Sequence, residues 1–157
     1  MSIIFPTYSE KKSLSKSKQK KFCIWQIVTN RERKRMRKLA LSDEILLSVD
    51  KAARYIGGEV NSVMKDKKEV TTRVAFCFPD VYEIGMSHLG MKIIYDQMNR
   101  RDDVYCERVF SPWVDLDKVM REENIPLFAL ESQDPVFMFD FLAVTIQYEM
   151  CYTNILQ

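Results

Sequence analysis

Apolar and polar positions from residue 39 onward alternate in blocks that are typical of an α/β domain. Capping residues followed by apolar side chains at helical spacing predict a short helix over about 43–54, which ends before Gly57 and Gly58. The β-branched and aromatic run 70–78 stops at Pro79 and predicts a buried first strand. A strand therefore follows a helix at the start of this pattern.

Two strand–loop–helix units are expected next. Ser87 is expected to cap a helix in which apolar residues recur at helical spacing, namely Leu89, Ile93, Ile94 and Met98. The second strand is expected at 104–110, and it precedes a helix over 115–123. The inward positions of that helix are predicted to be Leu116, Val119 and Met120.

The segment from 127 to 147 is harder to place. Residues 127–130 are short and extended, and the apolar run 141–147 predicts a buried strand. The residues between them leave room only for a one-turn crossover such as 136–139, whereas parallel neighbours need about a dozen connecting residues. Whether 127–130 joins the sheet as a parallel strand or as an edge piece stays open. A helix is expected to begin near Met150.

These elements predict a Rossmann-like, flavodoxin-type parallel sheet in residues 39–157. A doubly wound sheet usually continues until both of its faces are covered. We therefore expect a sheet that is incomplete at its C-terminal side, with an exposed edge that favours aggregation or marginal folding.

Charge divides the chain into two chemically different pieces. The formal net charge of the 157 residues is +2, but residues 1–38 carry +10 and residues 39–157 carry −8. The basic segment 1–38 is expected to be a disordered leader, whose attraction to nucleic acid or an anionic membrane would be nonspecific. Alternatively, Met36 is the natural start and residues 1–35 derive from upstream sequence. No apolar stretch approaches the ~18–20 residues of a membrane span.

Cysteine and histidine usage excludes several kinds of site. The cysteines at 23, 77, 106 and 151 lack the close spacing of zinc, redox and iron–sulfur motifs. Reduced thiols in a cytoplasmic protein fit this spacing, and Cys77 is expected to act as a small hydrophobe. His88 is the single histidine, and a capping or surface role is favoured over contact with a ligand or ligation of a metal.

Ligands of open parallel sheets bind outside the carboxyl ends of the strands. Three loops occupy that position here, at 79–90, 111–113 and 147–149. In the first loop, Gly85 and Gly90 would let the backbone approach a bulky ligand, and the following helix N-terminus would offer amides to an anionic group. The competing interpretation is that both glycines serve turns and helix packing. For Tyr148, Glu149 and Tyr152, which follow the predicted strand 141–147, ligand contact and packing are equally favoured.

Four segments, 53–63, 78–90, 107–113 and 147–149, closely resemble the N-terminal part of a group of radical S-adenosylmethionine (radical SAM) proteins with a cobalamin-binding-type domain. The resemblance covers 39–157 in order and at the family spacing. It implies a Rossmann-like cobalamin-binding fold ahead of a radical SAM barrel. In that barrel, a Cys-x-x-x-Cys-x-x-Cys loop binds a 4Fe-4S cluster beside S-adenosylmethionine. No part of that loop occurs in this sequence.

The resemblance also bears on cobalamin. Related domains with an axial histidine carry Asp-x-His-x-x-Gly, whereas His88 here has Met86 two residues before it and Met91 three after it. A base-off corrinoid without a protein histidine is therefore the expected arrangement, with no metal-ligating or catalytic residue in this chain. The residues implied to bind the cofactor are Asp80, Gly85, Ser87, His88, Gly90, Trp113, Gln147, Tyr148 and Glu149.

Three functions follow as hypotheses, and in the third of them the basic segment 1–38 is the functional element and binds nucleic acid. In the first, the chain is the N-terminal cobalamin-binding-like fragment of a radical SAM enzyme, inactive alone because the cluster and the barrel, its partner, are missing. In the second, it is a noncatalytic Rossmann-like packing domain that binds no corrinoid.

Overall fold

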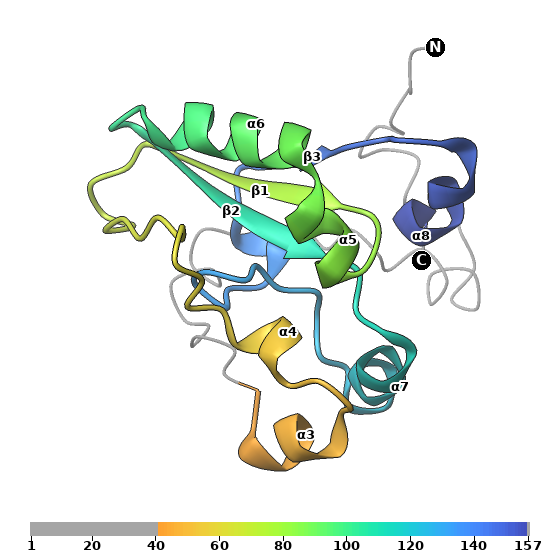
Figure 1. Ribbon diagram of the computed structural model, residues 1–157. Helices are drawn as coiled ribbons and strands as arrows, with labels where there is room; N and C mark the ends of the chain where they lie inside the picture. The colour runs from red at the N-terminus through yellow and green to blue at the C-terminus, as the bar shows by residue number, and fades with distance from the viewer. Residues whose placement is uncertain (1–40, 157) are drawn as a thin grey trace, which may run out of the picture. The chain divides into compact units, whose positions relative to one another are not determined.

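The computed structural model describes residues 41–156, and the expectations for residues 1–38 lie outside this range. Its centre is a three-stranded parallel sheet in the order β2-β1-β3 (Figure 1). The strands are β1 (Thr72–Phe78), β2 (Val104–Phe110) and β3 (Phe141–Val144). This order reproduces the first three positions of the flavodoxin-like order. The predicted α/β class and open parallel sheet are confirmed.

Short helices connect and cover the strands. They are α3 (Asp43–Ser48), α4 (Ala53–Ile56), α5 (Tyr82–Ser87), α6 (Leu89–Asn99), α7 (Val114–Glu123) and α8 (Tyr152–Leu156), with 3₁₀ turns η2 (Val136–Met138) and η3 (Glu149–Cys151). The helix predicted over 43–54 is wrong as a single element, because the chain is extended at Val49 between α3 and α4. The first loop also contains α5, which the sequence reasoning missed. The one-turn crossover near 136–139 is confirmed as η2. None of the helices within 41–156 has the length and apolar character that spanning a membrane requires.

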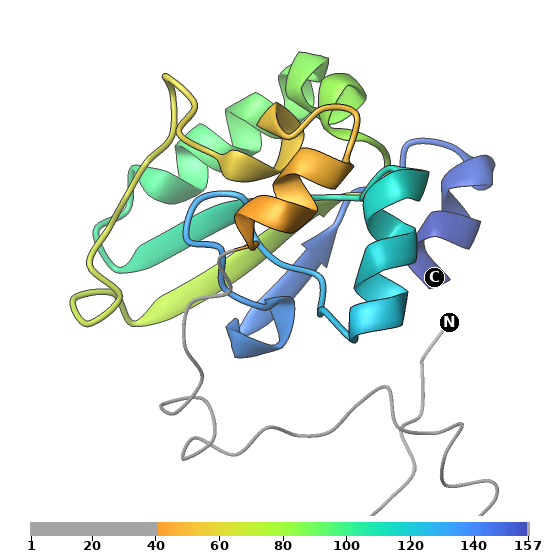
Figure 2. The ribbon, with the colours of Figure 1, turned by 90° about the horizontal axis from the view of Figure 1, so that it is seen from below.

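Helix α6 covers one face of the sheet, and the segment that follows α7 covers the opposite face (Figure 1). Val74, Phe76 and Phe78 of β1 pack against Met91 and Tyr95 of α6. The opposite face packs under the segment that follows α7, where Ala75 and Val109 meet Ala129 and Phe139. A further cluster joins α3 and α4 to α7, which lie side by side in Figure 2; it comprises Leu41, Val49, Tyr55, Leu116, Met120 and Phe128.

The buried face of α6 differs from the prediction. Leu89, Ile93 and Ile94 are exposed, while Met91, Tyr95 and Asn99 are buried. The side chain of Asn99 donates to the Cys106 carbonyl at 2.9 Å and accepts from the Cys106 N–H at 3.0 Å. These paired hydrogen bonds fix the rotation of α6 over β2. Apolar spacing alone did not reveal them, because both stripes of the helix contain large apolar residues.

The outer edge of β2 is covered by the chain itself. Leu130 donates its N–H to the Arg108 carbonyl at 2.8 Å, and Arg108 donates its own N–H to the Glu131 carboxylate at 2.7 Å. Ser132 donates its N–H to the Glu107 carboxylate at 2.9 Å. Residues 127–130 are thus an edge piece rather than a strand of the sheet. The only β-bridge of this segment is the antiparallel one between Phe128 and Pro135.

The β3 strand is shorter and more exposed than the predicted buried strand 141–147. It pairs only with β1, and Phe141 and Leu142 are 64% and 45% exposed. The prediction of burial was wrong because, among the described residues, β3 lies at an edge of the sheet with no neighbour on its outer side.

Candidate functional site

The loops after β1 and β3 meet at the carboxyl end of the sheet. Asp80 follows β1, and its carboxylate accepts the Tyr148 hydroxyl at 2.9 Å and the Val81 N–H at 2.7 Å. Asn154 of α8 donates to the Pro79 carbonyl at 2.9 Å. The hydrogen bond to the Asp80 carboxylate raises the pKa of Tyr148. These contacts lie at the boundary between β1 and β3, where strand order reverses and open sheets bind ligands.

A groove of about 770 Å³ opens beside these contacts, on the α7 side of the sheet. Side chains from β1, β3, α7, α8 and the connecting loops line it: Cys77, Asp80, Val81, Ser111, Pro112, Trp113, Val114, Asp117, Met120, Arg121, Asn124, Ile125, Pro126, Leu127, Leu142, Val144, Asn154 and Ile155. The Arg121 guanidinium donates to Asp117 at 2.8 Å, so these two charges are paired. The remaining lining is largely apolar.

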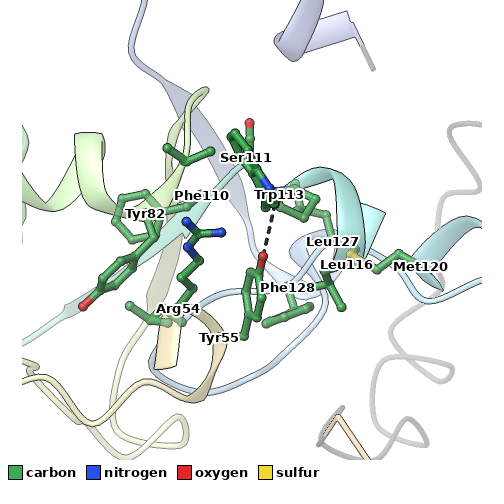
Figure 3. Close-up of a pocket in the computed structure, with 13 residues that line it drawn as sticks. Arg54, Tyr55, Tyr82, Phe110, Ser111, Trp113, Leu116, Met120, Leu127 and Phe128 are labelled. Carbon is green, nitrogen blue, oxygen red and sulfur yellow. Dashed lines mark hydrogen bonds between the residues drawn. The ribbon is translucent and has the colours of Figure 1, made fainter. Parts of the chain in front are cut away.

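A second cavity lies between α4, α5 and α7 (Figure 3). Its volume is about 20 Å³, which is enough for one water molecule. The Tyr55 hydroxyl accepts the backbone N–H of Trp113 at 3.2 Å. The Arg54 guanidinium lies 5.4 Å from the centre of the Trp113 ring. Burial raises the pKa of Tyr55. The side chains around this cavity pack three helices together, and the cavity is too small for a cofactor.

Gly85 is buried and Gly90 is half-buried, and both lie close to aromatic rings. A Cβ on Gly85 would lie 2.3 Å from Cε1 of Phe110 and 3.2 Å from Cδ1 of Phe78. A Cβ on Gly90 would lie 3.0 Å from Cε1 of His88. Gly85 therefore allows α5 to contact the ends of β1 and β2, and this geometry favours the packing interpretation over approach of a ligand.

His88 begins α6. Its Nδ1 accepts the Met91 N–H at 3.2 Å, and its ring centre lies 5.3 Å from that of Phe78. The helix cap is thus His88 rather than the predicted Ser87, whose hydroxyl donates to the Ile84 carbonyl at 2.8 Å. An imidazole in this role fixes the turn between α5 and α6. His88 does not line the groove.

The nine predicted binding residues are therefore separated. Asp80 and Trp113 line the groove. Tyr148 does not line it, but its hydroxyl donates to the Asp80 carboxylate. The four residues between positions 85 and 90 contribute to α5 and α6 instead, and Gln147 and Glu149 are exposed. Sequence reasoning missed Asn154; a carboxamide one helical turn after the third loop is the signal that would have identified it.

The site residues do not fit a histidine-ligated corrinoid, since Nδ1 of the single histidine accepts a backbone N–H and the ring packs on Phe78. Within 41–156, no group of three or more His, Cys, Asp or Glu side chains is arranged to hold a metal ion. Burial raises the pKa of both Cys77 and Cys106 to about 12, which disfavours the thiolate form that ligates metals.

Comparison with known proteins connects this geometry to a family. Residues 90–157 match the family model described as radical SAM proteins, N-terminal. The matched region runs from α6 through α8 and includes β2, β3 and most of the groove lining. The match supports a radical SAM protein. No curated protein and no solved structure matches the chain.

Proposed function

We propose that this chain is the N-terminal, noncatalytic α/β domain of a radical SAM protein, and that its groove and β3 edge form the surface on which the catalytic part packs. One observation carries the proposal. The residues matched by the family model, 90–157, include large apolar side chains that are exposed to solvent. Phe141, Leu142 and Val114 have exposed fractions of 64%, 45% and 71%. An apolar surface beside a groove is typical of a protein–protein contact.

The chemistry of the cysteines supports a noncatalytic role. A 4Fe-4S cluster bound by three cysteine thiolates would supply the electron for radical chemistry when present. In this chain Cys77, Cys106 and Cys151 are unbonded to each other and lie in separate elements. Cys106 and Cys151 are buried. We therefore assign the cluster to another part of the protein.

The chain's own residues hold the groove in shape. The Tyr148–Asp80 and Asn154–Pro79 hydrogen bonds tie the segment after β3 to the end of β1. The paired charges of Asp117 and Arg121 lie on the α7 side of the groove. In this proposal, the domain presents a fixed surface and takes no part in proton or electron transfer.

The DNA beyond the codon for Gln157 tests this proposal. We expect an open reading frame that encodes the Cys-x-x-x-Cys-x-x-Cys loop. The purified chain alone should bind no 4Fe-4S cluster after treatment with iron and sulfide under reducing conditions. A cluster that forms on residues 1–157 and cleaves S-adenosylmethionine would contradict the noncatalytic role.

A base-off corrinoid is the second candidate function. The groove lies at the carboxyl ends of the strands, and its volume of about 770 Å³ is within the range of about 300–1,000 Å³ for small-molecule sites. Hydroxocobalamin added to micromolar protein should then shift its visible absorption bands, and Trp113→Ala should weaken the shift. An unchanged spectrum would favour the docking function alone.

A further inference from the structure

The linking segment, residues 124–134, connects the groove to the closed edge of β2. Its first residues, 124–127, line the groove. Its last residues, 129–134, lie against the β2 edge, where they form hydrogen bonds with Glu107 and Arg108. One continuous segment therefore contacts the groove at one end and the buried charges at the other.

Both ends of the linking segment have left-handed backbone. Among the described residues, the non-glycine positions with positive φ are Asn124 and Gln133, with φ of 55° and 59°. Asparagine tolerates this conformation, whereas glutamine adopts it rarely. A residue in such a conformation is held there by its surroundings, and these residues are frequent in segments that switch between two arrangements.

Side chains, rather than a strand ladder, hold the linking segment at the β2 edge. The Gln133 carboxamide donates to the Tyr55 carbonyl at 2.9 Å and to the Leu130 carbonyl at 3.1 Å. Residues 128–135 are all buried, and four of them, 131–134, are polar or charged. Loops usually lie on the surface because their polar groups need partners, and here side chains supply those partners. Loss of one side-chain contact therefore weakens the attachment of the segment without breaking the sheet.

The groove end of the segment packs beside a thiol. Leu127 and Cys77 both line the groove, and both pack against the buried cluster that contains Ala129. Val136 donates its N–H to the Leu127 carbonyl at 2.8 Å, which holds the two ends of the loop 128–135 together. Leu127 is therefore tied to the rest of the loop, and a movement of the loop away from the sheet would uncover the Cys77 thiol.

We infer that the linking segment is a conformational switch with two positions, seated against β2 as in the structure or released, and that its release opens the groove wall at Leu127. As a means of regulating docking in the groove, this switch rests on the proposed function. Because coupling between two sites is reciprocal, a contact in the groove that favours one position also changes the attachment at the β2 edge.

Alkylation of the full chain by iodoacetamide tests the inference, since access to the Cys77 thiol reports the position of the groove wall. Gln133→Ala removes both carboxamide hydrogen bonds and leaves the buried charges in place. It should raise the alkylation rate of Cys77 by about tenfold, as measured by mass spectrometry. Gln97→Ala makes the same chemical change at an exposed position of α6 and should leave the rate unchanged.

Cys106 separates local release from unfolding of the whole domain. Burial raises the pKa of Cys77 and of Cys106 to about 12, so access rather than thiolate content distinguishes them. Cys106 packs in the cluster under α6 and does not line the groove. Gly85→Ala would place a Cβ 2.3 Å from the Phe110 ring and so destabilises the whole domain. It should raise the alkylation rate of Cys106 without raising that of Cys77.

A second variant and a second measurement examine the far end of the segment. Glu131→Gln removes the charge that pairs with Arg108. The Ser132 N–H donates to Glu107, so this variant keeps both partners of that hydrogen bond. Exchange of the Ser132 N–H and alkylation of Cys77 should rise by the same factor in Glu131→Gln and in Gln133→Ala, because one movement exposes both groups.

Three results would overturn the inference: an unchanged Cys77 rate in Gln133→Ala, an equal rise of the Cys77 rate in Gly85→Ala, or faster exchange of the Ser132 N–H without faster alkylation of Cys77. None of these results bears on whether a cluster loop is encoded downstream, so the proposed function fails or stands separately.

Discussion

Removal of the Glu131 carboxylate should open the covered edge of the sheet. One carboxylate oxygen accepts the backbone N–H of Arg108 at 2.7 Å, and the other accepts the side-chain Nε–H of Arg108 at 2.6 Å. The side chains of Glu131 and Arg108 are 0% and 5% exposed. In Glu131→Ala, the buried guanidinium keeps only the Ser62 hydroxyl and the Met86 sulfur as hydrogen-bond acceptors, and a strand N–H loses its partner.

The expected loss is large compared with the stability of a small domain. Breaking a buried ion pair by removing one partner costs about 3–5 kcal/mol, whereas domains have a total free energy of unfolding of about 5–15 kcal/mol. Glu131→Gln keeps one acceptor and should lose about 1–3 kcal/mol. Urea denaturation followed by circular dichroism measures both losses. Glu122→Ala, at an exposed position of α7, should change the free energy by less than about 0.5 kcal/mol.

The same pair predicts a pH dependence. Burial raises the pKa of Glu131 above its ordinary value, and the charge of Arg108 opposes part of that rise. The folded protein then binds this proton more tightly than the unfolded chain, whose glutamates have a pKa of about 4.3. The stability from this carboxyl is present below that pKa and is lost as the pH rises through the folded pKa.

Relative to Glu131→Gln, the wild type should therefore become less stable as the pH rises above about 4. A wild-type advantage that grows over this range would contradict the pKa direction. A loss below about 1 kcal/mol in Glu131→Ala would refute the view that this pair closes the edge.

Three further substitutions test the candidate site. Gly85→Ala should destabilise the domain by about 1–3 kcal/mol, because its Cβ would lie 2.3 Å from the Phe110 ring of β2. Gly90→Ala should destabilise it less, because the nearest atom to its Cβ would lie at 3.0 Å, and thermal denaturation compares the two variants. Cys77 should react slowly with iodoacetamide at neutral pH in the folded protein and faster in urea, because burial raises its pKa to about 12; mass spectrometry locates the label. Asp80→Asn should lower the pKa of Tyr148 toward its ordinary value; an ultraviolet pH titration measures this pKa, with Tyr148→Phe identifying the signal of Tyr148. If another group causes the shift, the pKa of Tyr148 will be the same in Asp80→Asn as in the wild type.

The strands were predicted well because their sequences carry a local signal. The predicted strand 104–110 is the observed β2, and β1 starts two residues later than predicted, at Thr72. A run of β-branched and aromatic residues bounded by proline or aspartate is enough to locate a strand. The degree of burial of a strand could not be predicted from its own residues. The β3 sequence is as apolar as that of a buried strand, but β3 lies at an edge of the sheet, and its burial depends on whether another strand pairs with it.

The meeting of two loops at one edge of the sheet was predicted from the sequence, but the set of side chains that line the groove was not. Asp80 and Tyr148 are far apart in sequence, and the rule for parallel sheets correctly brought their loops to one edge. Gly85 and His88 are closer to Asp80 in sequence, but they belong to α5 and α6, which pack on the other face of the sheet. Sequence proximity to a strand end thus does not indicate on which face a side chain lies.

Buried charged residues are often catalytic, but the charged cluster of this domain has a different position and chemistry. Arg73 pairs with Glu107 and with Asp134, the latter at 2.9 Å, and its guanidinium lies 4.2 Å from the centre of the Phe139 ring. These side chains join β1 and β2 to the segment that covers the β2 edge, away from the groove. The charges therefore close one edge of the sheet, while the groove beside the other edge is largely apolar and its Arg121 charge is paired with Asp117. A surface of that composition suits the proposed docking role better than acid–base chemistry.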